Sequence, residues 1–156
     1  MKRFSVLMVI LALATMGTAP ALAANRNFAT HLEGGNEVPA VSTSGQGQAI
    51  FQVAEDGASI DYKLIVANIE DVTMSHIHIG GAGVNGPVTV FLFGPNLAGV
   101  DVNGVLAQGT ITASDLIGPL AGQPLSALIE AMESGNAYVN VHTLDNPGGE
   151  IRGQLG

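Results

Sequence analysis

Between residues 27 and 155, apolar and polar positions alternate in short segments that are separated by Gly, Asn and Pro. In the segment 46–54, for example, Ala49 and Phe51 share an apolar face, whereas Gln48 and Gln52 lie on the opposite face. This two-residue period predicts β-strands with one buried face. Strands are expected over residues 27–33, 46–54, 58–67, 72–79, 87–93, 105–112, 137–143 and 150–155.

One segment departs from the two-residue period. Between Pro124 and Glu133, apolar side chains recur at intervals of three and four residues, and Gly135 follows the last of them. This spacing predicts a short amphipathic helix near residues 124–133, with proline in its first turn and glycine just past its end. The expected fold is therefore an all-β antiparallel sandwich or barrel in one domain, with this helix covering an open end.

The N-terminus carries a different pattern. The basic residues Lys2 and Arg3 precede an apolar run over residues 4–16, and small residues surround Ala23. A basic start, a short apolar stretch and an Ala-x-Ala site predict a secretory signal peptide over residues 1–23. The alternative is a retained membrane anchor, but no basic stop-transfer flank follows. The mature chain, residues 24–156, is then expected in the periplasm of a bacterium or outside the cell.

The net charge of the chain bears on which partners it can bind. The chain of 156 residues has 5 basic and 13 acidic residues, a net charge of −8. Removal of the signal peptide leaves 3 basic and 13 acidic residues, a net charge of −10. Such a surface repels phosphate backbones, so nucleic acid is not an expected partner. The chain also has no cysteine, and it lacks a phosphate-binding loop, a dinucleotide motif and a serine-hydrolase elbow.

The histidines are the main candidates for chemistry. Strand alternation sends His76 and His78 to one face, about 7 Å apart along the chain, which allows both to bind one ion. His142 shares a face of its own strand with Tyr138 and Asn140. It becomes a third ligand if the two strands pair. Three imidazoles suit copper, with zinc as second choice. The remaining histidine, His31, is a candidate fourth ligand, although a solvated structural role is the simpler interpretation.

The C-terminal strand places Glu150 and Arg152 on one side. The simpler interpretation is an exposed pair of charges that keeps an edge strand soluble. The functional alternative is that Arg152 guides an anion toward the histidines or anchors the adjacent turn against them.

Three blocks of sequence resemble the CHRD domain, a domain named after chordin. They are HLEGGNEVP from His31, HIHIGGAGVNGPV from His76, and YVNVHT from Tyr138 with the downstream GGEIRG. The blocks occur in the family's order, and the resemblance covers nearly the whole mature chain. It implies an extracellular β domain that occurs in bacteria as a secreted protein, and no general catalytic activity.

A looser resemblance concerns the strand that carries His76 and His78 and the later strand that carries His142. Both look like the copper-ligand strands of copper/zinc superoxide dismutases, which implies a Greek-key β-sandwich and a copper site. Arg152 is then in a position similar to that of the family's anion-guiding arginine. The sequence lacks that family's disulfide cysteines, an obvious bridging histidine and a recognisable zinc loop. The resemblance therefore implies a copper site more directly than dismutase activity.

The leading hypothesis is a secreted or periplasmic protein that binds copper or zinc through His76, His78 and His142, with His31 as a candidate fourth ligand. Two alternatives remain open. One is a metal-free extracellular module that binds a protein partner, and the other is a redox enzyme similar to superoxide dismutase. The sequence leaves the oligomeric state open.

Overall fold

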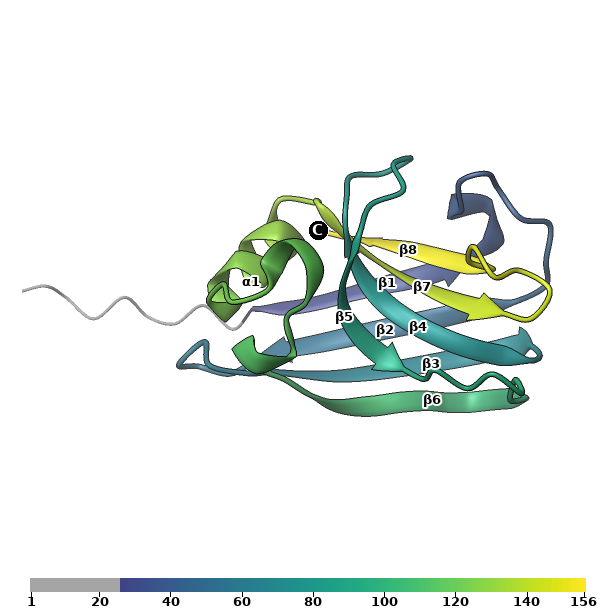
Figure 1. Ribbon diagram of the computed structural model, residues 1–156, viewed down its shortest axis with the longest axis horizontal. Helices are drawn as coiled ribbons and strands as arrows, with labels where there is room; N and C mark the ends of the chain where they lie inside the picture. Colours follow the sequence, from purple (N-terminus) through teal and green to yellow (C-terminus); the bar gives the residue numbers. More distant parts are fainter. Residues whose placement is uncertain (1–25) are drawn as a thin grey trace, which may run out of the picture.

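The computed structural model describes residues 26–156 (Figure 1). The expected signal peptide, residues 1–23, lies outside the described residues. No helix within residues 26–156 has the length and apolar character needed to cross a membrane.

Eight strands and one α-helix make up the described chain. The strands are β1 (Asn27–Glu33), β2 (Gln46–Val53), β3 (Ile60–Ile69), β4 (Val72–Ile79), β5 (Val88–Phe93), β6 (Val102–Ile111), β7 (Ala137–Thr143) and β8 (Ile151–Leu155). The helix is α1 (Leu125–Glu133), and three short 3₁₀ turns occupy Gly34–Asn36, Ala113–Asp115 and Gly118–Leu120.

All eight strands form one antiparallel sheet, in the order β5-β4-β7-β8-β1-β2-β3-β6. The pairings of β3 with β6 and of β4 with β7 join strands that are three apart in sequence, which is the mark of Greek-key topology. The sheet curls until its two ends approach each other. The Tyr62 hydroxyl of β3, the neighbour of edge strand β6, donates a hydrogen bond of 2.8 Å to the Leu92 carbonyl of the other edge strand, β5. The all-β expectation is confirmed as a sandwich-like, nearly closed barrel.

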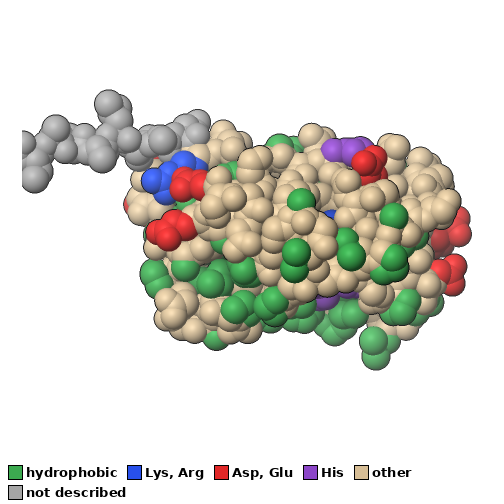
Figure 2. Space-filling model, turned by 90° about the horizontal axis from the view of Figure 1, so that it is seen from above, with side chains coloured by type: hydrophobic (Ala, Val, Ile, Leu, Met, Phe, Trp, Pro, Cys, Tyr) green, Lys and Arg blue, Asp and Glu red, His purple; other side chains and the backbone are tan. Residues whose placement is uncertain are grey.

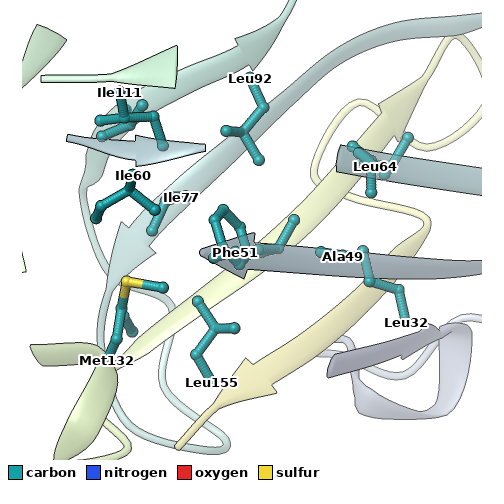
Figure 3. Close-up of a cluster of buried hydrophobic side chains, with 14 of the residues drawn as sticks. Leu32, Ala49, Phe51, Ile60, Leu64, Ile77, Leu92, Ile111, Met132 and Leu155 are labelled. Atoms are coloured by element: carbon teal, nitrogen blue, oxygen red, sulfur yellow. The ribbon is translucent and has the colours of Figure 1, made fainter. Parts of the chain in front are cut away.

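The interior is filled by the apolar face of each strand, as the alternation predicts (Figure 3). Ala49 and Phe51 of β2 are fully buried, and so is Ile77 of β4. The helix α1 closes one end of the barrel (Figure 1), where its apolar side chains join the same core. These are Leu125, Leu128, Ile129 and Met132, which are the residues that the helical spacing selects.

Several strand boundaries differ from the expectation by one to three residues, and two of these differences lie where β3 pairs with β6. β3 runs to Ile69 rather than to residue 67, and β6 begins at Val102 rather than at residue 105. Asn68 has a φ of 55° and Gly104 a φ of 140°, and the register between the two strands shifts in this region. Bulges of this kind let polar and flexible residues lie inside a strand pair. The alternating pattern therefore ends β3 too early and starts β6 too late.

Candidate metal centre

The predicted ligand strands lie side by side. β4 and β7 are hydrogen-bonded neighbours, with His76 opposite Asn140 and His78 opposite Tyr138. Since alternate residues point to opposite faces, the histidines lie on the outer face when Ile77 packs in the core. The pairing on which the third ligand depends is therefore present.

The three imidazoles of His76, His78 and His142 converge. One ring nitrogen from each lies within 4.8 Å of the others, and His76 Nδ1 is 3.1 Å from His142 Nε2. Imidazole nitrogens bind zinc at about 2.0–2.1 Å, so two adjacent ligands of one ion are about 3 Å apart. The spacing of His76 and His142 already has this value.

Two loops cover the histidines and fix the orientation of their rings. His78 Nδ1 lies 2.9 Å from the Gly86 carbonyl, and His142 Nδ1 lies 3.0 Å from the Pro147 carbonyl. A carbonyl only accepts, so both Nδ1 atoms carry the proton and leave a lone pair on Nε2. An imidazole that ligates a metal usually donates its other N–H to such a carbonyl. The tautomers of His78 and His142 are therefore those of ligands that bind through Nε2.

His76 completes this arrangement. Because His142 Nε2 carries a lone pair, His76 Nδ1 donates its proton across the 3.1 Å between them. Its Nε2 atom is buried without a hydrogen-bond partner, and the ring packs edge-on against Phe91 at 4.4 Å between centroids. A single proton thus occupies the space that an ion shared by His76 and His142 would take.

The site keeps its histidines neutral. Burial lowers the pKa of His76 to about 3, and the neighbouring His142 and His78 act in the same direction. Burial also lowers the pKa of His78 and that of His142. The neutral imidazole is the form that binds metal, so three ligands are ready at neutral pH.

These shifts predict how the stability of the metal-free protein depends on pH. An unfolded histidine has a pKa of about 6.5. Below that pH, His76 is therefore protonated in the unfolded chain and stays neutral in the folded protein. The free energy of unfolding should therefore fall as the pH falls from about 6.5 toward 3. Urea unfolding with a chelator, at pH 7 and at pH 5, measures the loss. His76→Leu should reduce it and His31→Ala should not, whereas equal losses in wild type and His76→Leu would contradict the assignment.

The environment of Arg152 differs from the simpler interpretation of its sequence position, an exposed charge on an edge strand. The expectation of an exposed pair on an edge strand is wrong, because β8 lies between β7 and β1 and the Arg152 side chain is 1% exposed. Its guanidinium donates to the Gly81 and Val84 carbonyls, at 3.1 and 2.9 Å, and to Asn85 Oδ1 at 3.2 Å. It therefore fixes the loop that carries the Gly86 carbonyl. The guanidinium faces this loop rather than solvent.

A stack links Arg152 to the histidines. The guanidinium carbon lies 3.4 Å from the centroid of the Tyr138 ring, and His78 stacks on Tyr138 at 4.7 Å with the rings 8° from parallel. Cation–π and stacking contacts of this kind hold the His78 ring in one plane. Arg152 thus supports both the covering loop and the ligand beneath it.

Glu150 holds the second loop. It is buried and accepts hydrogen bonds from Thr43 Oγ1 at 2.6 Å, Thr143 Oγ1 at 2.7 Å and Asn146 Nδ2 at 3.1 Å. These contacts order the turn that presents the Pro147 carbonyl to His142. The two charges therefore anchor the two loops over the histidines.

His31 lies apart from the cluster. It is exposed on β1, opposite Gln48, and β8 separates its strand from β7. Within the described residues, the group that could hold an ion is His76, His78 and His142 without His31. In Figure 2, histidine side chains (purple) are visible at two separate places on the surface.

Two residues of the site were missed by sequence reasoning. Asn140 is 3% exposed, and its Oδ1 atom lies 3.0 Å from His78 Nε2. Glu37, in the loop after β1, is 6% exposed, and burial raises its pKa, while the Arg152 charge and the Asn140 amide oppose the rise. Alternation does place Asn140 on the ligand face, but nothing in the loop around Glu37 indicates burial.

The fold and the cluster together define an all-β Greek-key domain with a candidate metal site. Residues 28–155 match the family model of the CHRD domain. Because this match covers most of the chain, the protein belongs to the CHRD domain family, and the resemblance stated from the sequence is confirmed. CHRD domains are typically extracellular. No curated protein and no solved structure matches the chain.

Proposed function

We propose that the protein is an exported CHRD domain that binds one transition-metal ion through His76, His78 and His142. The observation that carries the proposal is the convergence of three neutral, buried imidazoles within 4.8 Å of one another. Two of them donate their outer N–H to backbone carbonyls, as ligating histidines do. Cleavage after Ala23 and location in the periplasm or outside the cell are part of this proposal.

The donor set favours copper, with zinc as second choice. Imidazole nitrogen suits both ions, and divalent copper binds such sites more strongly than zinc does. When bound, the ion would supply Lewis acidity and, in the case of copper, one-electron redox capacity. The three histidines would hold the ion, the backbone carbonyls that accept from two of them would orient the rings, and burial would keep water away.

Burial favours holding the ion over catalytic turnover. His76, His78 and His142 are between 4% and 7% exposed. A catalytic metal needs an open coordination position that substrate can reach. The buried cluster therefore supports storage, delivery or sequestration before redox catalysis.

A copper(II) titration of the mature chain, residues 24–156, tests the proposal. Calorimetry should give one tight site, and thermal melting should rise because an ion that prefers the folded state stabilises it. At a free concentration of 100 times Kd, the added stability is about 2.7 kcal/mol. Weak binding at several sites without stabilisation would overturn the proposal and favour a metal-free interaction module. Zinc, titrated in parallel, should bind at the same stoichiometry and more weakly.

A further inference from the structure

Asn140 lies between a ligand histidine and a buried carboxylate. Its Oδ1 atom faces His78 Nε2 at 3.0 Å. Its Nδ2 atom and Glu37 Oε1 both lie next to Gly149, so close that a Cβ atom on this glycine would meet both of them. Glu37 Oε1 is itself buried and has no hydrogen-bond partner. The amide thus spans the short distance from the histidines to Glu37.

The orientation of this amide follows from its two neighbours. The carboxylate of Glu37 is an acceptor when ionised, so the donating NH₂ group faces it and the amide oxygen faces His78. Burial raises the pKa of Glu37, and the Arg152 charge and the Asn140 amide oppose the rise. A carboxyl oxygen of Glu37 can face the Asn140 NH₂ group as an acceptor in either protonation state. Glu37 therefore keeps Oδ1 directed at the cluster.

In this orientation, a lone pair of Asn140 Oδ1 points at a lone pair of His78 Nε2. The Nδ1 proton of His78 is donated to Gly86, so its Nε2 presents a lone pair. Asn140 Oδ1 has only lone pairs to offer. Two acceptors 3.0 Å apart repel each other unless a proton or a metal ion lies between them. In a buried site such an unmatched pair of acceptors is costly, and an ion satisfies both.

The spacing also fits an ion. Oxygen ligands bind zinc at about 2.0–2.2 Å, and adjacent ligands of one ion are then about 3 Å apart. The separations of 3.0 Å between Asn140 Oδ1 and His78 Nε2, and of 3.1 Å between His76 Nδ1 and His142 Nε2, both have this value.

We propose that Asn140 Oδ1 is the fourth ligand of the ion and that Glu37 is the positioning residue that directs it. This inference rests on the proposed three-histidine site. It gives three nitrogens and one oxygen from the protein and leaves no open position, and four protein ligands without an open position are typical of sites that hold an ion rather than expose it to substrate. A neutral amide oxygen is a hard ligand, so the set selects copper(II) or zinc(II) over copper(I).

Asn140 variants test the ligand. Asn140→Ala should lower copper(II) affinity by about 100-fold, and Asn140→Asp should restore or exceed wild-type affinity because it retains an oxygen and adds a charge. The copper(II) electron paramagnetic resonance spectrum should change in both variants, since the fourth ligand changes. Asn103→Ala, at an exposed asparagine of β6, is the matched control and should leave affinity and spectrum unchanged. Melting without metal establishes that each variant folds.

Glu37 variants test positioning. Glu37→Ala should lower affinity by about 10- to 100-fold, the usual effect of losing a group that orients a ligand, and should alter the copper spectrum. Glu37→Gln retains an oxygen that can face the Asn140 NH₂ group and should restore most of the affinity. A role in folding alone would lower the melting temperature and leave the spectrum of the bound ion unchanged.

The outcomes separate the two proposals. If wild-type protein binds no ion, the three-histidine site fails, and the inference about Asn140 fails with it. If wild-type protein binds one ion while Asn140→Ala and Asn140→Asp keep its affinity and spectrum, Asn140 is not a ligand and the histidine site stands.

Discussion

Replacing His76 and His78 together by alanine abolishes stoichiometric copper(II) binding, according to the site described above. Two of three imidazoles are lost, and one remaining histidine cannot enclose an ion. The measurement is a calorimetric titration of the double variant beside wild type. The rise in melting temperature with copper should disappear as well, because the ion no longer prefers the folded chain.

The matched control for this experiment is His31→Ala. His31 is exposed on β1, so its replacement should leave copper affinity at the wild-type value. This control also tests whether His31 contributes a fourth ligand, as the sequence allowed. Unchanged copper affinity in the His76/His78 double variant would contradict the proposed site, and a loss of affinity in His31→Ala would contradict its three-histidine composition.

Replacing Arg152 by alanine should destabilise the protein by about 3 kcal/mol or more. The buried guanidinium satisfies three oxygen acceptors of the loop after β4 and stacks on Tyr138. Hydrogen bonds to a charged group contribute about 1.5–3 kcal/mol each, and the lost packing on Tyr138 adds to this. Urea unfolding of the metal-free protein measures the change in the free energy of unfolding.

Copper affinity should fall in the same variant, because the loop holds the Gly86 carbonyl that orients His78. Lys63→Ala, at an exposed position of β3, removes the same charge from the surface and should change neither stability nor affinity by much. Arg152→Lys should recover only part of the loss, since one ammonium cannot reproduce the planar fork of donors. A loss below about 1 kcal/mol in Arg152→Ala would contradict the anchoring role.

The strands and the helix could be predicted because their patterns are local. Alternation in residues 46–54 and the helical spacing in residues 124–133 each depend on a few neighbouring positions. The ends of β3 and β6 could not be placed, since Asn68 and Gly104 lie in bulges that depend on the partner strand.

The candidate site was predictable only in part. The spacing of His76 and His78 indicates shared ligation by itself, whereas His142 joins them only through the pairing of β4 with β7. Greek-key pairings join distant segments, and no local pattern specifies them. Burial of Arg152 follows from the central position of β8, and burial of Glu37 follows from a loop without periodicity. Both required the tertiary structure.

X-ray absorption at the copper edge, on mature protein loaded with one equivalent of copper(II), tests the central claim most directly. The predicted result is three imidazole nitrogens at about 2.0 Å from the metal, with the imidazole signal lost when both His76 and His78 are replaced by alanine. Copper held by fewer than two imidazoles, or the same spectrum in the double variant, would contradict the site.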